Sequence, residues 1–462
     1  MVFLKQTIWS SLINNSSSFI NILGTLILMR LISPEVFGIY AFLIATREII
    51  SAFCCLKTSQ AYLFSKGNES SIKYLIKITL YSSIFFLIIS IIVSFTLYHY
   101  QHENYFLLFV LCGLTIINNL SSLFISFFEK KMDFKSSSVI RAAGLNVSLL
   151  ITLIIAYFYR NNIYTLIIKE LLYSLILLFL TAKLKYVRYI FNNKSEYKNK
   201  EFKKLLKYSL KSYIPNITEI LSYKIFDIYL SYAAGKNILG LFYQSINIIR
   251  IPYKFLGSAT DNILFVHIKN KKKNEFDFLL LQKIILLIFV PIVITINLFS
   301  ENIINLILGT AWLEIGKNIN YLSVFLLILP LYNSLIVNLQ ASNNQNVLIT
   351  SNLTVITIQC LLFFLVSELT LKNICIIFSV SFYLSIVFLI YSSYKKKLFV
   401  TNDLYKFFIY LSSFNILFFF LTFSNNSIYY FLIIFIYIFY FIKEKNIFLK
   451  NYQIYDKNFS KK

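Results

Sequence analysis

Apolar runs of about twenty residues recur along the whole chain, and they limit its fold more than any other feature. Each run is long enough for an α-helix to cross a hydrocarbon core of ~30 Å. The runs lack the short alternating pattern of barrel strands. With 58% hydrophobic and 14% charged residues, the composition also excludes an ordinary soluble protein. The sequence therefore predicts an all-α polytopic membrane protein.

We expect about fourteen transmembrane helices, forming two pseudo-symmetric six-helix lobes around a central cavity, with an additional helix pair after them. The predicted spans are 8–31, 38–62, 74–98, 104–128, 137–159, 163–182, 206–233, 238–266, 278–299, 319–340, 346–367, 371–393, 404–423 and 427–443. The corresponding domains are an N-terminal lobe (1–182), a cytoplasmic basic linker (183–206), a C-terminal lobe (207–395), the additional pair (396–443) and a cytoplasmic basic tail (444–462). The linker suits an interfacial amphipathic helix and a solvated segment equally well.

The formal net charge of +24 is concentrated in alternate loops, as the positive-inside rule requires. Basic residues fill the loops at Lys5, 66–77, 130–141, 183–211, 269–273, 395–406 and the tail from Lys443. The alternate loops carry only Arg30, Arg160, Lys236, Lys317 and Lys372. We therefore predict that both termini are cytoplasmic, and we assign the charge to membrane topology and not to nucleic acid.

Ionisable residues interrupt the two predicted spans between 207 and 265. They are Glu219, Lys224, Asp227, Arg250, Lys254 and Asp261. A charge near the bilayer centre costs ~2.5–3.5 kcal/mol even on lenient scales, so such groups normally face a bundle interior or a wet cavity. This pair of spans is the predicted functional region.

The first sixty residues repeat the pattern of this pair. At an offset of 202 residues Gly38 falls on Gly240, and one residue further Arg47 falls on Arg250. Ser51 and Thr58 then correspond to Lys254 and Asp261, which places a polar stripe on one helix face in each half. Two halves with matching stripes are typical of transporters whose site lies between the halves.

Arg47, Arg250 and Lys254 are the candidate substrate-binding residues, because guanidinium groups bind phosphate through paired hydrogen bonds. The alternative is internal ion pairing, either of Lys224 with Asp227 or of the cations with Glu219 or Asp261. Glu219, Asp227 and Asp261 are candidate proton or sodium carriers, and a structural role suits them equally. The five cysteines lie in apolar segments without C-x-x-C spacing, so we infer no disulfide, metal site or cofactor.

Four stretches together resemble the O-antigen and polysaccharide flippases (Wzx type) of the multidrug/oligosaccharidyl-lipid/polysaccharide (MOP) exporter superfamily. They are MRLISPEVFGIYAF continuing to TSQAYL, FFEKKMDFKSSSVIRAAG, DIYLSYAAGKNILGLFYQSINIIRIPYKF and NLILGTAWLEIGKNINYLSVFLLILP. The resemblance covers residues 1–395 and implies two six-helix lobes that rock between inward-open and outward-open states. It also implies an undecaprenyl-diphosphate-linked oligosaccharide as substrate. Arg47 and Arg250 match the positions of cavity arginines in the related lipid II flippases, whose lipid-groove helices the additional pair resembles.

The resulting hypothesis is a flippase of the bacterial inner membrane that carries out no enzymatic reaction. Its partners would be the lipid-linked oligosaccharide, membrane lipids, and polymerase and other polysaccharide-assembly proteins. A cation-coupled multidrug exporter of the same superfamily is the alternative. A membrane polymerase or glycosyltransferase would need a sizeable outer loop, whereas the longest predicted one is 300–318, with Glu301 and Glu314 as its acids.

Overall fold

The computed structural model describes residues 2–64, 71–99, 105–131, 133–182, 199–255, 278–341 and 344–395, and the regular elements of these ranges are helices. The first half contains α1 (Val2–Leu31), α2 (Pro34–Cys54), α3 (Thr58–Phe64), α4 (Ser71–His99), α5 (Tyr105–Lys130), α6 (Phe134–Phe158) and α7 (Ile163–Ala182). The second half contains α9 (Asn199–Ala233), α10 (Lys236–Ile249), α12 (Phe278–Leu308), η1 (Thr310–Trp312), α13 (Leu313–Asn318), η2 (Ile319–Leu322), α14 (Ser323–Ala341), α15 (Gln345–Leu365) and α16 (Leu371–Lys395).

Ten helical segments of the described residues are long and apolar enough to cross a membrane. The polar α9 covers the predicted span at 206–233, and the short α10 covers the beginning of the predicted span at 238–266. The all-α polytopic membrane fold is therefore confirmed. The additional pair at 404–423 and 427–443 lies outside the described residues. So does the predicted linker up to residue 198, whereas its last residues are the first turns of α9.

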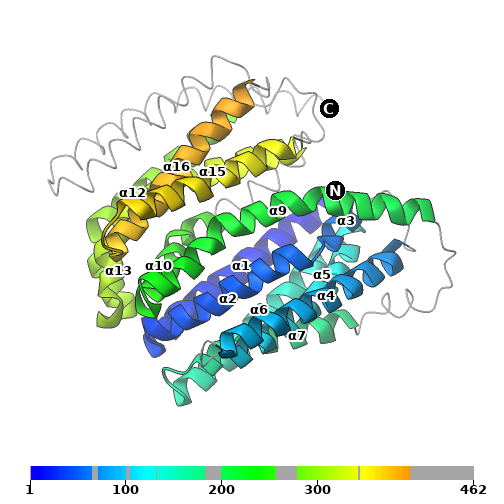
Figure 1. Ribbon diagram of the computed structural model, residues 1–462, viewed down its shortest axis with the longest axis horizontal. Coiled ribbons are helices and arrows are strands. Elements are labelled where there is room, and N and C mark those ends of the chain that lie inside the picture. The colour runs from blue at the N-terminus through cyan, green and yellow to red at the C-terminus, as the bar shows by residue number, and fades with distance from the viewer. Residues whose placement is uncertain are drawn as a thin grey trace.

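The helices run roughly side by side in two groups that meet at α2, α9 and α10 (Figure 1). In this view α4 to α7 lie on one side of these three helices, and α12, α13, α15 and α16 lie on the other. α2 packs against both α10 and α9, and α9 in turn packs against α15. The pair of spans that the sequence singled out thus lies at the junction of the two halves.

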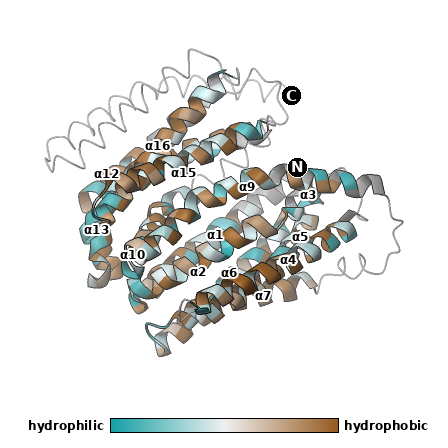
Figure 2. Cartoon of the chain, viewed as in Figure 1, coloured by the Kyte–Doolittle hydropathy of each residue, from teal (hydrophilic) through white to brown (hydrophobic). Residues whose placement is uncertain are grey.

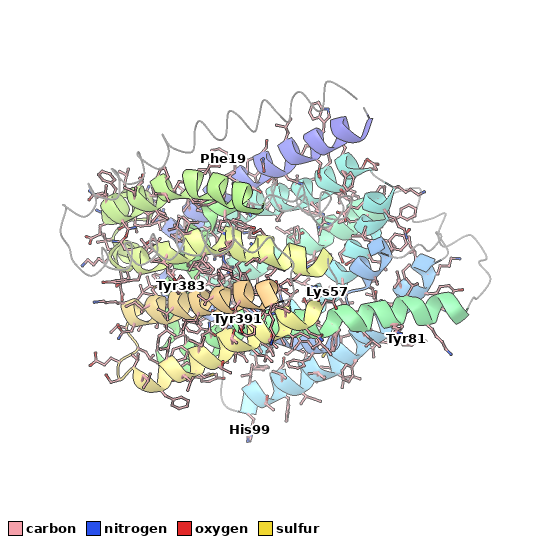
Figure 3. The ribbon with its side chains drawn as sticks, turned by 90° about the horizontal axis from the view of Figure 1, so that it is seen from above. Phe19, Lys57, Tyr81, His99, Tyr383 and Tyr391 are labelled. Atoms are coloured by element: carbon pink, nitrogen blue, oxygen red, sulfur yellow. The ribbon has the colours of Figure 1, made fainter. Side chains whose placement is uncertain are left out.

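Apolar residues cover most of the length of the helices, and hydrophilic residues gather near helix ends such as α13 (Figure 2). Many large apolar side chains are exposed, including Phe19, Tyr81 and Tyr391, which come from three different helices (Figure 3). A lipid-facing surface needs this pattern, because hydrocarbon tails are as apolar as the side chains that they contact.

Gly38 on α2 and Gly240 on α10 lie directly against each other. A Cβ atom at Gly38 would overlap the carbonyl of Lys236, and one at Gly240 would overlap the carbonyl of Pro34. Pro34 and Lys236 are themselves 202 residues apart, so the contact is reciprocal, as around a local twofold axis. This contact supports the sequence repeat, and it explains both glycines, since only a residue without Cβ allows so close a helix crossing.

Further contacts join the halves at this end of the bundle, which we call the Gly38 end. The Trp312 Nε1 donates to the Met29 carbonyl at 2.7 Å, and Arg30 Nη2 donates to the Leu306 carbonyl at 2.8 Å. The Trp312 ring also meets Phe37 edge-on, with 5.7 Å between ring centroids. The two halves are therefore closed against each other here.

Two predicted boundaries are wrong. The single span expected at 38–62 consists of α2 and the separate α3, with residues 55–57 between them outside any helix. The expected outer connection at 300–318 is the end of α12 followed by η1 and α13, and Trp312 and Ile315 are fully buried there. Apolar residues between the polar ones form the buried face of this segment. The average composition of a sequence window does not reveal that face.

Candidate functional site

The site is built where α2, α7, α9 and α10 approach one another. Arg47 points from α2 toward Glu170 on α7, with Nη1 3.4 Å from Oε2. The other carboxylate oxygen, Oε1, accepts a hydrogen bond of 2.9 Å from the Tyr40 hydroxyl, one helical repeat of seven residues before Arg47. Glu48 lies 3.8 Å from the Arg47 guanidinium. Arg47 thus lies between two carboxylates.

A second ion-pair group crosses from α9 to α2. Lys224 Nζ lies 3.2 Å from Asp227 on its own helix and 3.6 Å from Glu48 of the first half. Asp227 is buried, at 5% exposure, so a cationic partner offsets the cost of holding its charge away from water. The pairing of Lys224 with Asp227, predicted from their i,i+3 spacing, is confirmed.

Arg250 has a different environment. α10 ends at Ile249, and Arg250 forms the turn after it, since Pro252 has no N–H to continue the helical hydrogen bonds. The guanidinium carbon lies 4.9 Å from the ring centroid of Tyr223 and 5.6 Å from that of Phe325. Its Nε is buried without a hydrogen-bond acceptor.

No carboxylate of the described residues lies within 4.0 Å of Arg250. Its charge still interacts electrostatically with that of Asp227. Aromatic faces attract a guanidinium, but they do not accept the directional N–H hydrogen bonds that an anion would accept. Arg250 therefore keeps hydrogen-bonding capacity that an anionic ligand could use.

Lys254 and Lys169 add positive charge beside Arg250. Lys254 follows one helical turn after Arg250, and its amide donates to the Arg250 carbonyl at 3.0 Å. Its ammonium is within electrostatic range of both Arg250 and Lys169 of α7. Cations from the two halves thus lie within electrostatic range of each other, although Lys169 is not one of the residues in the predicted stripes.

The other two candidate carboxylates are not part of this group as described. Glu219 is an exposed side chain on α9, and its charge interacts with that of Lys57, in the segment between α2 and α3 (Figure 3). Asp261 lies outside the described residues. Glu219 and Lys57 thus interact across the halves, and the predicted pairing of Arg250 or Lys254 with Glu219 or Asp261 stays a prediction.

The candidate site residues inferred from the sequence did not include Lys169, Glu170 and Glu48. The adjacent Lys169 and Glu170 interrupt the apolar run at 163–182, and this is the same signal that drew attention to the spans at 207–265. Glu48 directly follows Arg47 and points about 100° away from it on a helix, so helix geometry alone does not predict a contact between them. The long side chains nevertheless meet, and Glu48 also reaches Lys224 of the other half.

A sequence model of a protein family described as "Polysaccharide biosynthesis protein" matches residues 27–317, which is more than half of the chain. The chain belongs to this family of polysaccharide biosynthesis proteins. The resemblance noted in the sequence is thereby confirmed at the family level. No curated protein sequence matches the chain significantly.

Solved structures of MOP transporters share the fold of this family member. A lipid II flippase MurJ in an inward closed conformation superposes with a TM-score of 0.61 and 15% identity, over 97% of this chain and 99% of that one. An inward-facing multidrug MATE transporter gives 0.60 and 15%, over 84% and 99%. An outward-facing one gives 0.55 and 14%, over 85% and 95%. The chain therefore has the fold of MOP superfamily transporters.

The described residues contain no group of three or more histidine, cysteine, aspartate or glutamate side chains that could hold a metal ion. Four of the five cysteines are buried, and Cys360 is exposed. The arrangement is suited instead to holding an anion between cationic side chains of two packed halves.

Proposed function

We propose that this protein translocates an undecaprenyl-diphosphate-linked oligosaccharide from the inner to the outer leaflet of the bacterial inner membrane. The family supports a role in polysaccharide biosynthesis, and the fold supports a transporter that works by alternating access. The observation that carries the proposal is Arg250, a cation at the junction of the halves with no carboxylate among the described residues in contact with it.

In this mechanism the diphosphate binds Arg250 and Lys254, with Arg47 approaching from the first half. The rings of Tyr223 and Phe325 contact the Arg250 guanidinium without accepting directional hydrogen bonds from it, so its N–H groups remain for phosphate oxygens. The sugars would occupy water between the halves, and the prenyl chain would stay in lipid. Opening of the Gly38 end would then release the headgroup on the outer side. No covalent bond changes, so the protein needs no catalytic residues.

The direct test is flipping of a fluorescent prenyl-diphosphate oligosaccharide in proteoliposomes. We expect Arg250→Ala to lower the initial rate at least tenfold and Arg47→Ala to lower it less, because Arg47 already has carboxylate partners. Arg160→Ala, at an exposed residue beside the turn before α7, is the matched control and should flip at the wild-type rate. Wild-type rates in both site variants at equal reconstitution would rule out the proposed substrate site.

A cation-coupled multidrug exporter is the second candidate, since multidrug transporters share the fold. Such a site needs carboxylates available to a cationic drug. Here Glu48, Glu170 and Asp227 each lie within 4.0 Å of an arginine or lysine, which argues against it. Drug resistance on overexpression, without any change in surface polysaccharide, would favour the exporter.

Orientation, coupling and partners belong to the same proposal. We place both termini in the cytoplasm on the basis of the loop charges. If an ion drives the cycle, Glu219, Asp227 and Asp261 are the proposed carriers, and Asp227 would have to exchange its contact with Lys224 for the ion. Polymerase and other assembly proteins would receive the flipped lipid.

A further inference from the structure

Glu170 occupies a defined position among the cations of the site. It projects from α7, with its side chain at 23% exposure, and it uses each carboxylate oxygen differently. Oε1 accepts the short hydrogen bond from Tyr40, at 2.9 Å, whereas Oε2 faces Arg47 at 3.4 Å. The tyrosine therefore fixes the carboxylate, and the arginine is the looser partner.

The Arg47 contact is weak in geometry for an arginine–carboxylate pair. Charge-assisted N–H···O bonds usually measure about 2.7–2.9 Å and are often bidentate. The Arg141–Glu129 pair of the same chain reaches 2.8 Å although Arg141 is more exposed. Arg47 instead makes one long contact with Glu170 and a still longer one with Glu48, at 3.8 Å. Its guanidinium is thus neutralised without being firmly held.

The charges around Glu170 nearly balance before any ligand is present. Arg47, Lys224 and Lys169 face Glu48, Glu170 and Asp227. Arg250, which has no carboxylate of the described residues within 4.0 Å, supplies positive charge beyond this balance. An anion that reaches Arg47 must therefore displace a carboxylate, whereas one that contacts Arg250 need not.

We propose that Glu170 is a tethered counter-anion that occupies Arg47 until a diphosphate replaces it, and that it thereby sets the preference for diphosphate over singly phosphorylated lipids. Tyr40 holds the displaced carboxylate during the exchange. A single phosphate can be satisfied at Arg250, but only an anion with a second phosphate gains enough from Arg47 to offset the loss of Glu170. The inference rests on the proposed function and specifies which residue enforces its selectivity.

The test is binding of pyrophosphate and of inorganic phosphate to the purified full-length protein in lipid nanodiscs, measured by calorimetry. Glu170→Gln removes the charge and keeps an amide oxygen that can accept from Tyr40. We expect it to bind pyrophosphate about fivefold or more tightly and to lose part of its preference over phosphate. Glu129→Gln, at the Arg141 pair, is the matched control and should bind like the wild type.

Tyr40→Phe tests the same idea in the opposite direction. Without the Tyr40 hydrogen bond the carboxylate is free to move closer to Arg47, so pyrophosphate binding should weaken. If Glu170→Gln does not fold, this variant alone decides. Unchanged pyrophosphate affinity in the folded variants would refute the role of Glu170. The proposed function stands in that case if Arg250→Ala still lowers the flipping rate at least tenfold, and its substrate site is ruled out if both Arg250→Ala and Arg47→Ala flip at the wild-type rate.

Discussion

Adding one methyl group at Gly38 or at Gly240 should loosen the closed junction of the two halves. Each glycine lies where α2 and α10 cross, and each faces a backbone carbonyl of the other helix. Backbone atoms cannot rotate away from a new Cβ as a flexible side chain could. The substitutions Gly38→Ala and Gly240→Ala must therefore move the two helices apart.

The size of the effect follows from the contact distances. A Cβ at Gly38 would lie 2.6 Å from the Lys236 carbonyl carbon, and one at Gly240 would lie 2.7 Å from the Pro34 carbonyl carbon. Carbon atoms pack at about 3.5–4.0 Å, so the helices must separate by roughly 1 Å. Overpacking of this kind costs about 1–3 kcal/mol, which corresponds to a shift of about 5- to 150-fold toward the open junction.

Spin labels on the two halves would report the separation. Tyr159 and Lys317 are exposed at the Gly38 end, one in each half. Tyr159 precedes a turn whose Asn161 backbone amide donates to the Leu31 carbonyl at the end of α1, at 3.1 Å. Lys317 belongs to α13, which follows Trp312. Labelled cysteines at these two positions, with the exposed Cys360 replaced by serine, should give one short distance by pulsed EPR. Either glycine variant should add a longer distance to the distribution.

Gly113→Ala is the matched control. It lies inside α5, where an added Cβ would have no neighbour within 4 Å, so this variant should gain about 0.5–1 kcal/mol of stability from the better helix former. Its label distance should not change. Because the two contacts are reciprocal, the double variant should cost less than the sum of the single ones. A wild-type distance distribution in both single variants would refute the view that this crossing limits opening.

Two further predictions concern polar contacts between packed helices. Lys224→Met should destabilise the protein by about 3–5 kcal/mol, because it leaves the buried Asp227 charge without its cation. Combining it with Asp227→Leu should recover most of this loss, as measured by thermal unfolding. Equal melting temperatures of the single and double variants would contradict this prediction. Trp312→Phe should weaken closure of the Gly38 end by about 1 kcal/mol through loss of the bond to the Met29 carbonyl, measured as faster labelling of a cysteine at Lys317. Unchanged labelling would show that this bond does not hold the junction.

The sequence determined the class of fold because the bilayer imposes a length and a polarity on every crossing segment. Apolar runs and loop charges predicted the helical membrane architecture, and the repeat matched Gly38 with Gly240, two glycines that the structure brings into contact. Arg250 could also be singled out, since an arginine inside an apolar run needs an explanation in any membrane protein.

Only the tertiary structure distinguished Arg47 from Arg250. The repeat makes them equivalent, yet Arg47 meets Glu170 from α7 and Glu48, while Arg250 meets the rings of Tyr223 and Phe325. Except for Glu48, which directly follows Arg47, these neighbours come from other helices, and side-chain spacing along one helix holds no information about them. The sequence by itself determined that charges enter the membrane, and the packing of α2, α7, α9, α10 and α14 decided which of those charges is neutralised within the protein and which is left for a ligand.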